Sequence, residues 1–376
     1  MNAATVAVIT SAMAAATAAA NDGRCNRAPA SNKYSFRSDT WTTVQASTAY
    51  SGWYKKNLRC TQAAFNVIAS RVAERWTDVH KPIHHNSSFS IVDRVAVAIN
   101  YLTHGGELFS SGQVFGMSEA RAHTYSGEVI DVLMLYLEET IHLPDTPDAW
   151  RRITEGFERQ TGFPGVVGAI DGSLVKIKRF KDHEGWYCRK GFPAFNIQVD
   201  DKLKFMSFSI RSGSQNDKSL FNRSQFGLND IPSGHYFLGD AGYVLYTHLM
   251  TPYPIRLGMS DVAHYNLIHS RTRICVKRAF GRWKNIFRIF KKDFIQHLPE
   301  EMARLIKATM ILHNWFIDLQ AEFDCAVDPD EDVSTEDWMH IGGDLPRPNS
   351  EYLISGDLAE ARRDLLKTWL YDNVLA

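Results

Sequence analysis

The sequence predicts an α/β protein in which a helical N-terminal part precedes a mixed sheet with flanking helices. Between Gly52 and about Leu143 the apolar residues recur at steps of three and four, the period of amphipathic helices. From Gly165 to Leu238 this period gives way to short apolar runs bounded by glycine and aspartate, as expected for strands. From Ser270 onward the helical period returns. The chain therefore passes from helices to strands and back to helices.

The composition is that of ordinary globular domains. The 376 residues are 44% hydrophobic, have a formal net charge of zero and include five scattered cysteines, and this length allows two or three domains. No CxxC or paired spacing occurs among the cysteines, so we expect free thiols and neither disulfides nor a zinc site. No run of about 18 apolar residues occurs, so the sequence predicts no membrane-spanning helix.

We expect five segments along the chain: an Ala-rich leader (1–48), a helical domain (49–145), a sheet-containing domain (150–320), an acidic linker (321–350) and a C-terminal helix (351–376). The leader has few large apolar residues and is expected to be disordered, with a secretion signal as the less favoured alternative. The acidic linker is expected to be a solvated segment and not a site. The C-terminal helix is expected to turn Leu365, Leu366, Trp369 and Leu370 inward.

The helical domain contains the outline of a helix-turn-helix. A short helix over Ser110–Phe115 is followed by a turn at Gly116 and by a longer helix that Ser118 opens and that runs to about residue 137. The second helix of such a motif can enter the major groove of DNA. The same outline also occurs in plain helical hairpins, and only Arg121 and His123 stand near the reading end. DNA reading by this element is therefore one of two alternatives.

The sheet-containing domain is expected to begin with a hairpin. Gly165–Ile170 is predicted to be a strand, Asp171-Gly172 its turn, and Leu174–Ile177 the return strand. Further strands are expected over Phe195–Val199, Leu203–Arg211 and Gly234–Leu238, the last of which leads to Asp240. Because aspartate is common in turns, a purely structural role is the alternative to a chemical role for both aspartates.

A basic amphipathic helix is predicted over Ser270–Lys292. Its apolar stripe comprises Val276, Ala279, Phe280, Trp283, Phe287 and Phe290. Its nine cations, with no acid before Asp293, are Arg271, Arg273, Lys277, Arg278, Arg282, Lys284, Arg288, Lys291 and Lys292. Such a local positive field suits a polyanion, and a solvated basic face is the alternative. A further helix is expected from Pro299 to Leu319, with His313 as a packing residue.

Two aspartates at the ends of separate strands, followed by a basic helix, suit the hydrolysis of phosphodiester bonds by two divalent ions. This chemistry needs carboxylates from separate elements that converge on a site about 4 Å wide. Mg²⁺ and Mn²⁺ select anionic oxygen ligands. The flanking helix would hold the nucleic-acid backbone in register.

Several ordered motifs are distinctive: GVVGAIDGSLVKI (165–177), WYCRKGFPAFNIQ (186–198), RSGSQNDKSLFNRS (211–224), FLGDAGY (237–243), LMTPYP (249–254), HYNLIHSRTRICVKRAFGRWKNIFRIF (264–290) and LHN (312–314). Together they resemble the PIF/Harbinger transposases of the DDE endonuclease superfamily, over about residues 90–320. The resemblance implies an RNase H-like fold. It also implies that Asp171 and Asp240 are the first and second catalytic carboxylates, both bound to metal.

The third carboxylate of that family is a glutamate in a V-E-R-A-F-G pattern, which here is Val276-Lys277-Arg278-Ala279-Phe280-Gly281. Lys277 therefore occupies the glutamate position. A lysine ammonium stays protonated at neutral pH and repels a divalent ion, so the site is expected to be weakened. Asp217, Asp261 or Glu184 could stand in for the missing carboxylate. Asp217 matches an aspartate that recurs in the family and that would support the metal ligands. The alternative is that Asp217 only stabilises a turn.

The resemblance leads to three functional readings. The first is a transposase-derived DNA-binding protein whose cleavage is lost or impaired. The second is a working Mg²⁺- or Mn²⁺-dependent endonuclease or transposase with a compensated site, and the third is a decayed copy without a selected function. For DNA contacts the candidates are Arg271, Arg273, Arg278, Arg282, Lys284 and Arg288.

The resemblance also implies partners and a location. The expected partners are DNA and a separate Myb/SANT-like DNA-binding protein that aids entry into the nucleus, the expected location. A cytoplasmic location is the alternative when that partner is missing. No membrane association is expected, and the oligomeric state, including a homo-oligomer, stays open.

Overall fold

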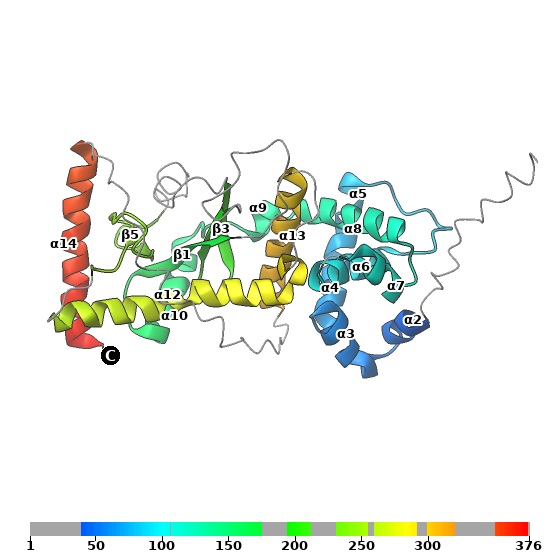
Figure 1. Ribbon diagram of the computed structural model, residues 1–376, viewed down its shortest axis with the longest axis horizontal. Helices are drawn as coiled ribbons and strands as arrows, with labels where there is room; N and C mark the ends of the chain where they lie inside the picture. The colour runs from blue at the N-terminus through cyan, green and yellow to red at the C-terminus, as the bar shows by residue number, and fades with distance from the viewer. Residues whose placement is uncertain are drawn as a thin grey trace, which may run out of the picture.

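The computed structural model describes residues 39–105, 107–174, 194–211, 231–254, 259–291, 299–319 and 350–374. Within them, a helical region precedes a mixed five-stranded sheet that is flanked by long helices, an RNase H-like arrangement. Figure 1 shows the helical region at one end of the molecule, the sheet in the middle and the C-terminal helix α14 (Ser350–Asn373) at the other end. The predicted fold class is confirmed.

The helical region comprises α2 (Asp39–Gln45), η2 (Thr48–Tyr50), α3 (Ser51–Leu58), α4 (Gln62–Glu74), α5 (Trp76–Val79), α6 (Ile91–Thr103), α7 (Leu108–Val114), α8 (Glu119–Met134) and α9 (Leu137–Thr140). Helix α6 is buried over most of its length and packs against α4 and α8. Its start is fixed by a capping box, in which Ser90 and Asp93 each bind the backbone N–H of the other. Helix α2 lies inside the expected leader, because the buried side chains of Trp41 and Val44 anchor it to the core.

The short helix, turn and longer helix predicted around residue 116 are present as α7 and α8. Gly116 adopts a φ of 66°, and the Ser118 hydroxyl accepts the backbone N–H of Arg121 at the start of α8. Arg121 and His123 are exposed on the first turns of α8. Helix α8 ends at Met134, slightly before the predicted end. DNA reading by α8 stays a prediction.

The sheet consists of β1 (Val166–Leu174), β2 (Ala194–Val199), β3 (Phe205–Arg211), β4 (Tyr236–Leu238) and β5 (Leu249–Met250), in the order β3-β2-β1-β4-β5. The pairs β1–β2 and β2–β3 are antiparallel, whereas β1–β4 and β4–β5 are parallel. Strand β5 was not predicted, because two residues carry no readable periodicity.

The predicted hairpin turn at Asp171-Gly172 is wrong. Strand β1 continues through both residues, and Asp171 stands opposite Ile197 of β2. An Asp-Gly pair forms a hairpin turn only where the chain reverses its direction. Here the chain runs straight through Asp171 and Gly172, and β2 is the antiparallel partner of this part of β1. Of the expected return strand, only Leu174 is described, as the last residue of β1, and residues 175–177 lie outside the described residues.

Successive sheet residues point to opposite faces and enter two apolar clusters. On one face, Val166, Ala169 and Leu238 join a large cluster that extends over α12 (Ser260–Ile286) and α13 (Pro299–Asp318) into the helical region. On the other face, Ile170 and Phe237 join a smaller cluster together with Trp150 of α10 (Pro147–Thr161), a helix that was not predicted. The sheet therefore shares its larger core with the helical region.

The predicted apolar stripe of the basic helix is confirmed, because all six of its side chains are buried. Helix α12 begins ten residues earlier than predicted, at Ser260, and ends at Ile286. The short helix η5 (Arg288–Lys291) follows and contacts α6. Figure 1 shows α12 running along the long axis of the molecule, from α14 to the helical region.

The LHN motif attaches α13 to the sheet. Asn314 accepts the N–H of Phe205 at 2.9 Å, and its amide donates to the carbonyl oxygens of Phe205 at 2.8 Å and of Thr140 at 3.1 Å. The buried His313 donates from Nε2 to the carbonyl oxygen of Leu203 at 2.9 Å and stacks on the Phe205 ring. Burial lowers the pKa of His313 to about 3. Its predicted packing role is confirmed.

The prediction for the C-terminal helix is partly wrong. Leu366 and Leu370 face the body of the protein, but Leu365 is 73% and Trp369 40% exposed. The surface beneath α14 is formed by Tyr236, Tyr253 and Asp261. Cationic side chains of α14 therefore also lie on the inward face of this helix. Within the described ranges, no helix combines the length and the apolar character needed to cross a membrane.

Candidate functional site

Strand register brings Asp171 and Asp240 to matching positions. Strands β1 and β4 are parallel, and Ala169 stands opposite Leu238. Each aspartate follows its paired residue by two positions, so both lie at the same edge of the sheet. The carboxylate of Asp240 accepts the N–H of Gly242 at 2.9 Å, which fixes the turn after β4.

Arg273 of α12 occupies one oxygen of the Asp171 carboxylate. Its guanidinium nitrogen lies 2.9 Å from Oδ2 of Asp171, and the two side chains are only 7% and 17% exposed. The other carboxylate oxygen accepts the N–H of Gly172 at 2.9 Å. This is a nearly buried, charge-assisted hydrogen bond between the helix and the strand.

The pKa of Asp171 shows which charges act on this carboxyl. Burial raises the pKa of Asp171 above its usual value, and the guanidinium of Arg273 opposes that rise. The charge of Asp240 raises the pKa further, while the N–H of Gly172 and the charge of Lys277 lower it. Asp171, Asp240, Arg273 and Lys277 therefore form one electrostatically connected group.

Lys277 stands one helical turn after Arg273, so both belong to the same face of α12. The Lys277 side chain is half-buried. The helix face directed at Asp171 and Asp240 therefore carries two cations, one of them at the position where the resemblance expects a glutamate. The role of Arg273 was missed because it had been grouped with the phosphate-binding cations.

The described residues do not fit a site for two divalent ions. Among them, no three His, Cys, Asp or Glu side chains gather in a way that could hold a metal ion. Asp171 and Asp240 supply the oxygen ligands that Mg²⁺ and Mn²⁺ prefer, but Arg273 already neutralises Asp171. The donor set is too small and its surroundings too positive for two ions.

The proposed substitutes for the missing carboxylate do not change this result. Asp261 lies in the first turn of α12 and forms an ion pair with Lys367 at 3.0 Å. It precedes Lys277 by sixteen residues, which is about 24 Å along the helix, so it cannot reach the site. Asp217 and Glu184 lie outside the described residues.

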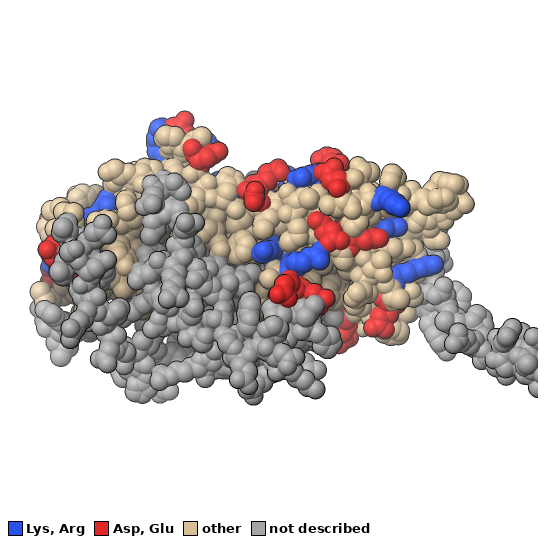
Figure 2. Space-filling model, turned by 90° about the horizontal axis from the view of Figure 1, so that it is seen from above, with Lys and Arg blue, Asp and Glu red and all other residues tan. Residues whose placement is uncertain are grey.

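The predicted DNA-binding cations differ in how far their side chains are exposed to solvent. Arg271, Arg278 and Arg288 are exposed, whereas Arg282 and Lys284 are half-buried. Arg273 differs from the expectation, because its guanidinium is buried against Asp171 and does not face solvent. On the face seen in Figure 2, the described acidic and basic side chains are interspersed.

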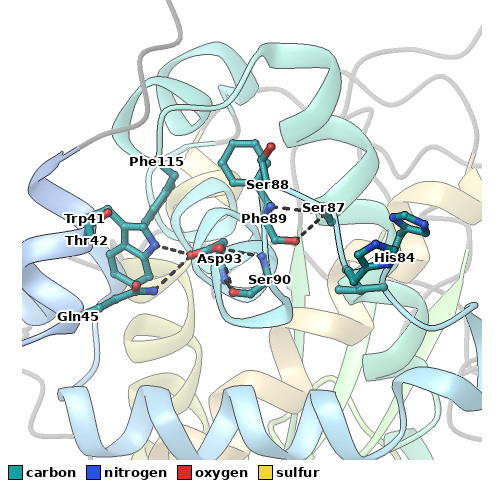
Figure 3. Close-up of a pocket in the computed structure, with 12 residues that line it drawn as sticks. Trp41, Thr42, Gln45, His84, Ser87, Ser88, Phe89, Ser90, Asp93 and Phe115 are labelled. Carbon is teal, nitrogen blue, oxygen red and sulfur yellow. Dashed lines mark hydrogen bonds between the residues drawn. The ribbon is translucent and has the colours of Figure 1, made fainter.

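A pocket lies in the helical region, between α2 and the segment before α6. It has a volume of about 370 Å³ and is lined by Trp41, Thr42, Gln45, Ile83, His84, His85, Ser87, Ser88, Phe89, Ser90, Asp93 and Phe115. Figure 3 shows Trp41 and Gln45 pointing to Asp93, which accepts their N–H groups at 2.8 and 3.3 Å. Its other oxygen accepts the N–H and the hydroxyl of Ser90. Because both oxygens are in use, Asp93 holds α2 against α6 and offers little to a ligand.

Comparisons with known proteins support the resemblance. Residues 170–314 match the family described as DDE superfamily endonuclease, a range that contains Asp171, Asp240 and Lys277. The chain is 26% identical to "Putative nuclease HARBI1" of Rattus norvegicus over 243 residues, which cover 62% of this chain and 69% of that protein. The human protein of the same name is 25% identical over 246 residues, covering 63% of this chain and 70% of that protein.

A plant relative extends the comparison. "Protein ALP1-like" of Arabidopsis thaliana is 25% identical over 295 residues, or 71% of each chain. No solved structure matches the chain. Residues 170–314 thus match the DDE superfamily endonuclease family, and the chain is distantly homologous to the proteins named "Putative nuclease HARBI1" and to "Protein ALP1-like".

Proposed function

We propose that this chain is a transposase-derived DNA-binding protein in which metal-dependent cleavage of phosphodiester bonds is lost or impaired. The observation that carries the proposal is the face of α12 opposite Asp171 and Asp240, which presents Arg273 and Lys277. A metal site in this position requires a net negative charge. Two carboxylates and two cations sum to zero, so little attraction for a divalent ion remains.

The magnitude of the lysine effect decides against a normal site. At about 4 Å and an effective dielectric constant of about 20, an ammonium and a divalent ion repel each other by on the order of 8 kcal/mol. A glutamate in place of Lys277 would convert this repulsion into an attraction of similar size. The attraction of Asp240 for the ion has about the same size and is cancelled by Lys277, while Asp171 is already paired with Arg273.

A nicking assay tests the loss of cleavage. With supercoiled DNA and Mn²⁺, we expect no metal-dependent nicking by the wild type and a gain of nicking for Lys277→Glu. The matched control is Arg151→Glu, which reverses the charge of an exposed arginine of α10 outside the proposed DNA-binding surface. Adding Asp240→Ala to Lys277→Glu is expected to abolish the gained activity. Metal-dependent nicking by the wild type that Asp240→Ala abolishes would overturn the proposal.

The DNA-binding part rests on the exposed cations of α12 and η5. Arg271 and Arg278 are seven residues apart and therefore share the solvent face of α12, and Arg288 is exposed on η5. Such side chains can contact phosphates without reading sequence. Lys284 and Arg282 are half-buried and are assigned a weaker contribution.

Salt dependence of DNA binding tests this part. Each phosphate contact contributes about 0.9 to the slope of log affinity against log salt concentration. We expect the double change Arg271→Ala/Arg278→Ala to weaken binding and to reduce the slope by about 2. Arg151→Ala, at a 65% exposed arginine of α10, is the control and should leave the slope unchanged. An affinity that is the same at low and physiological salt would contradict the proposal.

An active endonuclease is the second candidate function. It is favoured by the survival of two of the three carboxylates, Asp171 and Asp240, side by side at the sheet edge. In this case the flexible side chain of Lys277 swings away when metal and DNA bind. The nicking assay above separates the two candidates.

A nuclear location and a separate Myb/SANT-like partner belong to the same proposal, and their support is the family resemblance alone. Imaging of the tagged full chain with and without such a partner tests them. We expect nuclear accumulation that depends on the partner. Equal nuclear accumulation without it would contradict this expectation.

A further inference from the structure

Helix α14 is attached to the protein by its cationic side chains. Arg362 donates to the carbonyl oxygen of Thr247 at 2.9 Å and lies over the Tyr236 ring. Arg363 lies 4.0 Å from the centroid of the Tyr253 ring. Lys367 forms its ion pair with Asp261 of α12. The inward face of α14 thus combines these cations with the fully buried Ala359 and Leu370.

The outer face of α14 carries large apolar side chains instead. Leu358, Leu365 and Trp369 are 60%, 73% and 40% exposed. Their spacing of seven and four residues places them on one stripe of the helix. The stripe spans eleven residues, or about 16 Å. Single exposed leucines are common in proteins, but an aligned stripe on a helix that buries its cations marks a docking face.

The charges around the stripe show what kind of surface it fits. The four acids of residues 356–374 are all exposed, and the three cations of that segment all turn toward the protein: Asp357, Glu360, Asp364 and Asp372 against Arg362, Arg363 and Lys367. At 100° per residue, Asp372 lies about 40° and Asp357 about 100° from Leu358 on one side of the stripe, whereas Glu360 lies about 160° away, almost opposite it. The exposed charge of residues 356–374 is therefore negative, and Asp372 is the acid beside the stripe.

This charge decides between the occupants of the stripe. A second copy of α14 would bring acid against acid, and an anionic lipid surface would also be repelled. A helix with lysine or arginine beside its apolar stripe is complementary in both shape and charge. Figure 1 shows α14 at the end of the molecule away from the helical region, so such a partner would bind there.

We propose that the stripe of Leu358, Leu365 and Trp369 is a docking face for a basic amphipathic helix of a partner protein. The partner helix would place apolar residues at steps of three and four against the stripe and its cations against Asp372 and Asp357. This proposal does not depend on whether the chain cleaves DNA.

Binding of designed helical peptides to the full-length chain tests the proposal. The probe is a fluorescent peptide of about 20 residues, with leucines at steps of three and four and flanking lysines. A second peptide has glutamate in place of each lysine. Fluorescence anisotropy is measured with the wild type, Leu365→Ser, Asp372→Lys and the control Leu267→Ser, at a 41% exposed leucine of α12. Circular dichroism confirms that each variant is folded.

We expect the lysine peptide to bind the wild type and Leu267→Ser alike, and to bind Leu365→Ser and Asp372→Lys at least about tenfold more weakly. The glutamate peptide should not bind. Equal binding of both peptides, no binding of the lysine peptide, or no effect of Leu365→Ser would overturn the proposal. A dimer in sedimentation that Leu365→Ser dissociates would also overturn it, in favour of a second copy.

Discussion

Arg273 is the side chain that sets the electrostatics of the candidate site. It lies with Asp171 in a nearly buried ion pair, where the loss of hydration is offset only if both partners are present. Arg273 and Asp171 both lie within residues 170–314, the range that matches the DDE superfamily endonuclease family. In this chain the guanidinium supplies positive charge to Asp171 without a metal ion.

Loss of Arg273 should destabilise the fold. We expect Arg273→Met to lower the free energy of unfolding by about 3 kcal/mol, because it leaves the Asp171 charge buried without a partner. Adding Asp171→Leu should recover part of this loss. Urea denaturation measures the effect, with Arg271→Met, at an exposed arginine two residues away, as the control. Equal stabilities of the two single variants would contradict the ion-pair argument.

At the residue scale, the sequence predicted which aspartates lie together but not their partner. Asp171 and Asp240 each follow a short apolar run, and adjacent parallel strands then bring them to one sheet edge. The pairing of Asp171 with Arg273 depends on the rotation of α12 against the sheet. That rotation is set by the packing of Val276, Ala279 and Trp283, which the sequence could not place relative to β1.

The β2–β3 hairpin is an element whose turn depends on one buried acid. Asp200 is 8% exposed and accepts the N–H groups of Lys202 at 2.9 Å and Lys204 at 2.7 Å. Burial raises the pKa of Asp200 to about 7, and the two N–H groups only partly oppose this. The folded state therefore holds a proton on Asp200 that the unfolded chain loses near its ordinary pKa of 3.8.

This shift predicts a pH-dependent effect of Asp200→Asn. The raised pKa contributes stability below about pH 4, and that contribution is lost as the pH rises toward about 7. Asparagine can accept the same N–H groups without a charge. We expect Asp200→Asn to melt a few degrees above the wild type at pH 8 and at the same temperature at pH 4. A melting difference that does not change with pH would contradict the argument.

The turn between α7 and α8 depends on the absence of a side chain at Gly112. A Cβ atom there would lie 2.7 Å from the backbone oxygen of Met117. We expect Gly112→Ala to destabilise the protein by about 1–3 kcal/mol. Gly127→Ala in α8, where nothing lies within 4 Å of the added atom, should instead be neutral or stabilise by up to about 1 kcal/mol. Chemical denaturation of both variants checks this, and similar losses would contradict it.

Periodicity predicted most helices and strands. It could not predict which surface of the protein packs against each face of a helix. The prediction that the apolar stripe of α12 is buried was correct, because α12 is a central helix and its apolar residues pack into the core. On α14, Leu365 and Trp369 were placed inward on the same grounds, but the surface beneath that helix is formed by Tyr236, Tyr253 and Asp261. Cations fit this surface better than leucines.

The whole molecule is held together by a core that crosses the expected domain boundary near residue 145. Trp315 of α13 packs edge-on against Tyr136, which lies between α8 and α9, and the guanidinium of Arg71 lies over the Trp315 ring. Arg304 of α13 forms an ion pair with Asp131 of α8. One apolar cluster includes side chains from α2 to α14.

A shared core predicts one unfolding transition. We expect a single calorimetric peak for the full chain, with calorimetric and van't Hoff enthalpies that agree. Trp315→Ala, at a 3% exposed side chain, should lower the temperature of that single transition. Two peaks, with only one of them shifted by Trp315→Ala, would show that the helical region and the sheet unfold independently.

Calorimetric titration of Mn²⁺ into the purified full chain tests whether the two cations of α12 have removed the metal site. We expect no binding heat for the wild type, because Arg273 and Lys277 neutralise the two aspartates. We expect a new site in Lys277→Glu that disappears when Asp240→Ala is added. Binding of two ions to the wild type, abolished by Asp240→Ala, would show instead a compensated, active metal site.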